Sequence, residues 1–118
     1  HSNQEQFMTH KWIQEFLAAI TVCDTHGVIL EMNDKAAKTF EDEGGASLVG
    51  SNLMDCHNPH SQAMIQDMLI KGTSNIYTIE KKGKHKLIYQ APWFENGECM
   101  GLVEMSFVIP PDMPHFIR

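Results

Sequence analysis

The chain has 118 residues, of which 42% are hydrophobic and 20% are charged, and this is typical of one soluble globular domain. The formal net charge of −6 argues against a nucleic-acid-binding surface, for which basic side chains are expected. Three widely spaced cysteines do not suggest a disulfide framework, which favours a reducing, cytoplasmic setting. No apolar stretch approaches the ~20 residues of a membrane-spanning helix and no signal peptide is recognisable, so we expect no membrane contact.

The first predicted element is an amphipathic helix within residues 1–19. Its apolar side chains recur at the helical spacing i, i+3, i+4 and i+7: Ile13, Phe16, Leu17 and Ile20. Phe7, Met8 and Trp12 widen the apolar face beyond one stripe. Two interpretations stay open, because such a helix can pack on its own domain or pair with a second copy of the chain as a homodimer.

Residues 20–32 predict a β-hairpin, followed by a helix. Two apolar runs flank a Thr-His-Gly turn, in which Gly27 suits a positive φ. Either Asn33 or Asp34 can then accept the free backbone N–H groups at the start of the next helix. We therefore expect two paired strands that lead directly into a capped helix.

The middle of the chain contains an acidic break and a second amphipathic helix. Residues 41–45 read Glu-Asp-Glu-Gly-Gly, which predicts a surface loop and lacks the alternating ligand spacing of a calcium loop. Residues 61–70 place apolar side chains on one helix face: Met64, Ile65, Met68 and Leu69. Lys71 and Gly72 form a typical helix end.

Three strands are predicted to complete the domain, at 75–80, 86–94 and 99–109. Lys-Gly-Lys and Asn-Gly supply the two turns between them, and the prolines of residues 110–118 end regular structure. Two strands, several helices and three consecutive strands indicate an α+β fold, with one antiparallel sheet and its helices on one face.

The order of these pieces over residues 20–109 resembles a PAS domain. The matching segments are Asp24–Ile29, Met32–Ala37, Leu48–Leu53 and Gly97–Gly101. The resemblance implies a five-stranded antiparallel sheet in the order 2-1-5-4-3, which encloses a small pocket against the helices. It also implies the sensory part of a larger regulator, such as a kinase or transcription regulator, with an output domain elsewhere in the parent protein.

The resemblance divides the chain into three segments. Residues 1–19 form an N-terminal cap or dimerisation helix, 20–109 the PAS-like sensor domain, and 110–118 a proline-rich tail. Many PAS domains close with an Asp-Ile-Thr triplet that leads into an output helix. Here the corresponding region reads Phe-Val-Ile-Pro-Pro. Paired prolines block helix continuation, so we do not expect a direct helical output at this end.

The flavin photochemistry of some PAS proteins is not expected in this chain. Those members carry a cysteine directly after the Asn of a Gly-x-Asn-Cys-Arg stretch. Here Leu53 follows Asn52, and Cys56 comes three residues too late.

A haem- or metal-based redox sensor is the alternative function that the sequence leaves open. Haem-binding PAS members use a histidine on the helix that here begins near Ser61, and His60 is one residue early. A shift of one residue turns a helical side chain by about 100°, so haem through His60 or His57 is not the main expectation. Cys56, His57 and His60 together could also hold a metal ion, since thiolate and imidazole are zinc ligands.

A non-catalytic sensor that binds a small organic ligand, whose identity the sequence leaves unknown, is the main functional prediction. Aromatic and methionine side chains could line an adaptable pocket, although many of them also suit a core. The candidate lining residues are Tyr77, Tyr89, Trp93, Met64 and Met68. No nucleophile is paired with a base in a recognisable motif, so we do not expect an enzyme.

Overall fold

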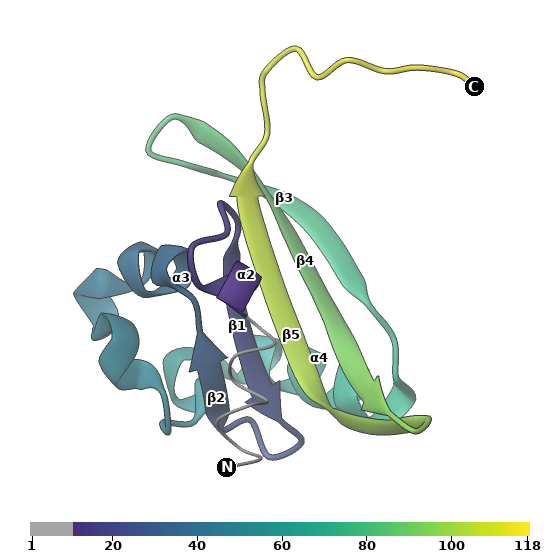
Figure 1. The fold of residues 1–118 in the computed structure, drawn as a ribbon. Coiled ribbons are helices and arrows are strands. Elements are labelled where there is room, and N and C mark those ends of the chain that lie inside the picture. Colours follow the sequence, from purple (N-terminus) through teal and green to yellow (C-terminus); the bar gives the residue numbers. More distant parts are fainter. Residues whose placement is uncertain (1–10) are drawn as a thin grey trace.

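The computed structural model describes residues 11–118 and places a five-stranded antiparallel sheet at its centre (Figure 1). The strand order is β2-β1-β5-β4-β3, which confirms the predicted order 2-1-5-4-3. In chain order the elements are α2 (Lys11–Gln14), β1 (Ala19–Asp24), β2 (Ile29–Met32), α3 (Asp34–Thr39), η1 (Glu41–Glu43), η2 (Gly45–Leu48), η3 (Leu53–Cys56), α4 (Pro59–Lys71), β3 (Asn75–Lys81), β4 (Lys84–Glu95) and β5 (Glu98–Val108).

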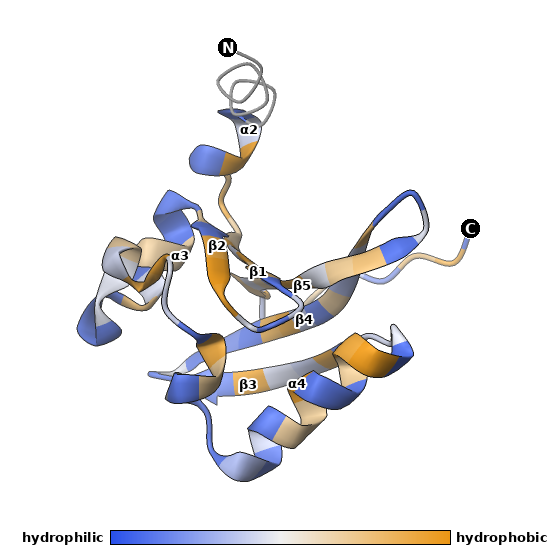
Figure 2. Ribbon diagram, turned by 90° about the horizontal axis from the view of Figure 1, so that it is seen from below, coloured by the Kyte–Doolittle hydropathy of each residue, from blue (hydrophilic) through white to orange (hydrophobic). Residues whose placement is uncertain are grey.

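The helices lie in three places relative to the sheet. Figure 2, turned by 90° from Figure 1, shows α4 on one side of the sheet and the short α2 on the other. Helix α3 and the 3₁₀ turns lie beside the β1–β2 half of the sheet (Figure 1). None of the helices within residues 11–118 is long and apolar enough to cross a membrane.

The first and last strands of the domain pair at the middle of the sheet. Residue Ala19 of β1 lies opposite Ser106 of β5, and Asp24 lies opposite Gly101. Gly101 has a φ of 152°, and a Cβ atom there would lie 1.9 Å from the carbonyl oxygen of Cys23. Only glycine allows the two central strands to approach this closely.

Two asparagines cap the N-termini of α3 and α4. The Oδ1 atom of Asn33 accepts from the backbone N–H of Ala36 at 3.0 Å, and that of Asn58 accepts from Ser61 at 2.9 Å. Each bond satisfies one of the N–H groups that a helix start leaves free. Helix α4 ends at Gly72 in the left-handed conformation, which confirms the predicted helix end.

Asn33 also determines where the chain enters the sheet. Its side chain is 2% exposed, and its Oδ1 atom accepts a second hydrogen bond, from the Ile20 N–H at 2.9 Å. Its Nδ2 group donates to the carbonyl oxygens of Ala18 at 2.8 Å and Ile13 at 3.0 Å. One amide therefore holds the end of α2, the start of β1 and the start of α3 together.

The predicted N-terminal helix extends less far than the sequence indicated. Residues 1–10 lie outside the described residues, and so do Phe7 and Met8 of its apolar face. Within the described part, the helix ends at Gln14, and Ala19 and Ile20 belong to β1. The prediction from helical spacing was wrong after Gln14, because the Asn33 side chain bonds the backbone of Ile13, Ala18 and Ile20 and holds this segment in a non-helical conformation.

The acidic segment at residues 41–45 was predicted as a plain loop, but it lies within two short 3₁₀ helices, η1 and η2. Its three acidic side chains are exposed, as a surface segment requires. Gly45 is buried with a φ of 55°, and a Cβ atom there would lie 3.1 Å from the carbonyl oxygen of Ala37. The segment therefore turns tightly against α3 instead of extending into solvent.

The hydrophobic core fills the space between α4 and the central strands. Its buried members are Cys23, Ile65, Met68 and Leu102, with Leu53, Met54 and Leu69 packed around them. Ile65, Met68 and Leu69 come from the predicted apolar face of α4 and pack toward the sheet, whereas Met64 of the same predicted face is 42% exposed. This core closes one end of the space that the helices and the sheet enclose.

We predict that Asn33→Ala lowers the free energy of unfolding by about 3 kcal/mol. The substitution removes a helix cap and leaves buried backbone groups without partners, each of which costs about 1–3 kcal/mol. Chemical denaturation measures the loss. Asn58→Ala is the matched control, because it removes only an exposed cap, worth about 1 kcal/mol. Equal losses in the two variants would contradict the linking role of Asn33.

Candidate functional site

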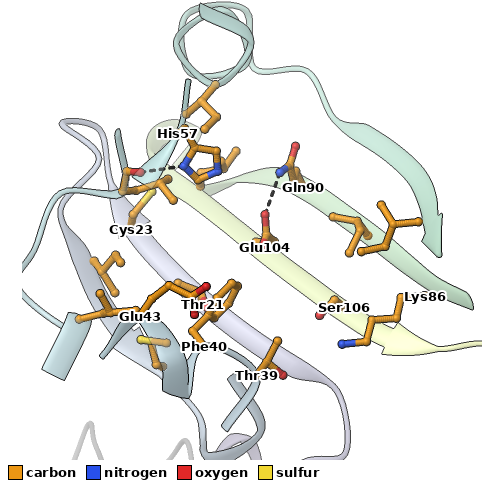
Figure 3. Close-up of a pocket in the computed structure, with 18 of the residues that line it drawn as sticks. Thr21, Cys23, Thr39, Phe40, Glu43, His57, Lys86, Gln90, Glu104 and Ser106 are labelled. Atoms are coloured by element: carbon orange, nitrogen blue, oxygen red, sulfur yellow. Dashed lines mark hydrogen bonds between the residues drawn. The ribbon is translucent and has the colours of Figure 1, made fainter. Parts of the chain in front are cut away.

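A cavity of about 310 Å³ lies between the inner face of the sheet and the helices (Figure 3). Every second residue of a strand points to the same face, so β3, β4 and β5 each contribute alternate side chains. The apolar walls include Ile29, Ile65, Ile79, Ile88 and Leu102. The polar lining includes Thr21, Thr39, Glu43, His57, Tyr77, Lys81, Lys86, Gln90, Glu104 and Ser106.

A buried amide orients a carboxylate on the floor of the cavity. Gln90 of β4 lies directly opposite Glu104 of β5 and is 6% exposed. Its Nε2 group donates to Glu104 Oε2 at 2.8 Å, and its Oε1 atom accepts from Asn75 Nδ2 at 3.4 Å. Gln90 therefore has a partner at both ends, and its amide direction fixes the position of the Glu104 carboxylate.

The His57 ring faces the same part of the cavity (Figure 3). Its Nδ1 atom lies 2.8 Å from the carbonyl oxygen of Leu53. A carbonyl oxygen only accepts, so Nδ1 carries the proton and donates. In the neutral ring, Nε2 is then an acceptor, and among the groups that the structure describes none donates to it.

Basic side chains lie at another part of the cavity wall. Lys86 is beside Ser106, near Thr39 and away from the pair formed by Gln90 and Glu104 (Figure 3). Lys81 also lines the cavity, and so does Glu43 on η1. The cavity therefore has an acceptor-rich end at Glu104 and a mixed, lysine-bearing end.

The environment of the cavity shifts the pKa of two side chains. Burial raises the pKa of the Tyr77 phenol above its usual value, and the charge of Glu104 adds to the effect. Burial also raises the pKa of the Cys23 thiol. A backbone hydrogen bond at Leu102 opposes this rise, and the acidic groups around Cys23 support it. Cys23 is thus kept as a thiol, which is a poor nucleophile.

The five residues predicted to line a pocket have different surroundings. Tyr77 lines the cavity, and Met68 belongs to the core below it. The indole N–H of Trp93 donates to the carbonyl oxygen of Cys23 at 3.0 Å, so this ring is held against the central strands. Met64 and Tyr89 are exposed, and Tyr89 follows the inward-facing Ile88 on β4.

Two of the three predicted metal ligands can be located by their side chains. His57 lines the cavity, whereas His60 is exposed in the first turn of α4. The side chain of Cys56 lies outside the described structure. Among the side chains that are described, no three from His, Cys, Asp and Glu gather at one point.

Sequence reasoning did not single out Glu104 and Gln90. A signal was present, because each is a polar residue two positions after an apolar residue that faces inward. Gln90 follows Ile88 at a spacing of two, and Glu104 follows Leu102 in the same way. The pairing register that brings them together depends on the turn between β4 and β5 and on the bulge near Trp93.

No protein-family model matches this chain, and no curated protein matches it. Solved structures do. A sensory box sensor histidine kinase from Vibrio cholerae aligns with a TM-score of 0.59 and 13% identity over 92% of this chain and 95% of its own. A PAS domain from Colwellia psychrerythraea aligns with a TM-score of 0.60 and 17% identity, over 89% of this chain and 97% of its own. The chain has the PAS fold.

A third PAS structure has a known cofactor. The Aer2 receptor from Vibrio cholerae, a dual PAS-haem oxygen sensor, aligns with a TM-score of 0.60 and 18% identity over 79% of this chain and 95% of its own. At such identities the likeness concerns the fold. What the cavity of this chain can bind therefore depends on the side chains that line it.

We predict that Glu104→Gln lowers the pKa of Tyr77 while leaving it above 10.0, since burial is the larger cause of the shift. A spectrophotometric titration in a Tyr89→Phe background follows Tyr77 as the remaining tyrosine. Because the folded pKa is raised, the associated stability is present below pH 10 and is lost as the pH rises through the folded value. An unchanged titration would mean that the Glu104 charge does not act on Tyr77.

Proposed function

We propose that this PAS-fold domain is a non-catalytic sensory module, which binds a small organic ligand between the sheet and the helices. The observation that carries this proposal is the polar cluster at the inner wall of the cavity. Gln90 and Glu104 form a fixed pair there, and the His57 ring lies opposite on the helical side (Figure 3). A cavity of about 310 Å³ with apolar walls and a few convergent polar groups suits a small molecule.

The chemistry of the cavity supports binding more than catalysis. Catalysis by nucleophilic attack needs an activated group, and burial keeps the Cys23 thiol protonated. Two polar side chains of the lining are fixed by bonds to other groups, since Gln90 donates to Glu104 and His57 bonds the carbonyl oxygen of Leu53. Such a fixed arrangement favours selective recognition of a ligand over proton transfer.

The central strands offer a route from the cavity to the rest of a parent protein. β1 and β5 both line the cavity, through Thr21 and Glu104 for example, and β1 pairs with β5 along all of its own length. α2 joins the start of β1 through Asn33, so a shift of β1 moves α2 as well. We propose that a change in ligand occupancy is transmitted through β1 and α2 to the rest of a larger signalling regulator, such as a kinase or transcription regulator.

We predict that Ile79→Trp prevents ligand binding by filling the cavity. Ile79 lines the cavity from the edge strand β3, where a larger side chain disturbs the sheet least. Native mass spectrometry of protein exposed to a cell metabolite extract should show an added mass that is lost on denaturation. Ile76→Trp is the control, because Ile76 is exposed on the opposite face of the same strand.

An added mass that persists in Ile79→Trp would place the ligand outside the cavity. No added mass on the wild-type protein would contradict ligand binding itself.

We also propose that the domain forms a homodimer through the α2 region. Three apolar side chains are exposed there: Trp12, Phe16 and Leu17, of which Leu17 is 83% exposed. The rings of Trp12 and Phe16 contact each other edge to face, with centroids 5.6 Å apart. A compact, exposed aromatic pair of this kind is typical of the centre of a protein interface.

We predict that Phe16→Glu weakens dimerisation at least about tenfold, because it places a charge in the apolar contact. Analytical ultracentrifugation over a concentration series measures the effect. Ile70→Glu is a suitable control, since Ile70 is an equally apolar, exposed residue on α4, on the other side of the sheet. An unchanged dimer in Phe16→Glu would place the interface elsewhere.

A haem- or metal-based redox sensor remains the second candidate function. One observation favours it: His57 donates through Nδ1 to a backbone oxygen and leaves Nε2 toward the cavity, as metal-ligating histidines commonly do. We predict that, if this function is correct, added haem produces a sharp visible absorption band that His57→Ala removes and His60→Ala leaves. A featureless spectrum together with clean elemental analysis would exclude it.

A further inference from the structure

The carboxylate of Glu104 lies in the cavity and has no cationic partner among residues 11–118. The ion pairs formed within residues 11–118 are Lys71–Asp67 and His85–Glu80, and both are on the surface. Glu104 accepts one hydrogen bond, from Gln90, and the remaining acceptor positions of its two oxygens are open to the cavity. A partly buried carboxylate is stabilised most by an opposite charge with N–H groups to donate.

Two of the polar side chains near Glu104 are held by other groups of the protein. Gln90 directs one N–H of its amide at Glu104, and its oxygen is bound by Asn75. His57 presents an acceptor at Nε2 in its neutral form, because Nδ1 donates to Leu53. This end of the cavity therefore favours a ligand group that donates hydrogen bonds and disfavours an anion.

The position of the lysines gives the ligand a direction. Lys86 lines the cavity away from Glu104 (Figure 3), and Lys81 lies on β3 beyond Ile79, the partner of Lys86. Glu43 lies near these two lysines, so that end has an excess of positive charge and is less suited to a cationic group than Glu104.

Between the two ends, Ile88 lies on β4 after Lys86 and before Gln90, and Ile79 lies opposite Lys86 on β3. Ile65 and Leu102 add an apolar wall on the other side of Glu104. A molecule with a cationic nitrogen at one end and an apolar body is matched by this sequence of surfaces.

We infer that the ligand of this cavity is a small organic amine, whose cationic nitrogen is bound by Glu104 and whose second hydrogen bond goes to His57 Nε2. The inference rests on the proposed ligand-binding function and specifies the class of molecule. Tyr77 is consistent with it, since its phenol stays protonated beside Glu104 and can serve as a neutral neighbour of the amine. A cavity of about 310 Å³ limits the ligand to a small molecule.

The test uses three probes of the same shape on the full chain: 2-phenylethylamine, 2-phenylethanol and 3-phenylpropanoate. Isothermal titration calorimetry measures binding to the wild-type protein, to Glu104→Gln and to Glu95→Gln. Glu95 is an exposed carboxylate at the turn between β4 and β5, so Glu95→Gln controls for the loss of one charge. We expect the wild-type protein to bind the amine more tightly than the alcohol and the acid. We expect Glu104→Gln to weaken amine binding at least about tenfold and Glu95→Gln to leave amine binding unchanged. Circular dichroism confirms that Glu104→Gln is folded.

Each other outcome overturns the amine assignment in a recognisable way. If the alcohol or the acid binds as tightly as the amine, or if Glu104→Gln leaves amine binding unchanged, the cavity is a ligand site for another class of molecule. If no probe binds, the assignment fails, while the added mass sought by native mass spectrometry still decides the proposed function. If amine binding survives Ile79→Trp, the amine lies outside the cavity and the assignment fails as well.

Discussion

The buried side chain of Asn33 is the constraint on which the arrangement of this domain depends. An amide has two donors and an oxygen that accepts twice, and here all four positions are used. They fix the end of α2 at Ile13, the start of β1 at Ile20 and the start of α3 at Ala36. Because β1 is a central strand and α3 borders the cavity, the position of the cavity wall follows from this one residue.

The sequence was sufficient for features that depend on neighbouring residues. The turn at Gly27, the end of α4 at Gly72 and the apolar face of α4 are local, and the family resemblance supplied the strand order. Features that depend on distant partners were missed: α2 stops early because Asn33 binds its backbone, and Glu104 meets Gln90 only through the pairing of β4 with β5. The alternation of side chains along β4 likewise leaves Tyr89 exposed while Ile88 is buried.

The cavity is lined by side chains from three parts of the fold. The floor comes from alternate residues of the sheet, His57 comes from the segment before α4, and the lysine-bearing end lies near α3 and η1. Because Gln90 and Leu53 hold the two polar groups at the inner end, these groups need little reorganisation when a ligand arrives. Selectivity in this domain is therefore a property of the sheet register as much as of the side chains themselves.

The pairing of β1 with β5 has a consequence for how the domain is made. The hairpins formed by β3, β4 and β5 join strands that are neighbours in the chain, whereas Ala19 meets Ser106 only after the rest of the domain has been synthesised. Contacts between distant residues close slowly and late in folding. On the ribosome, β1 therefore has to wait with its β5-facing edge open until β5 emerges, and during that interval a chaperone or a neighbouring nascent chain can bind it.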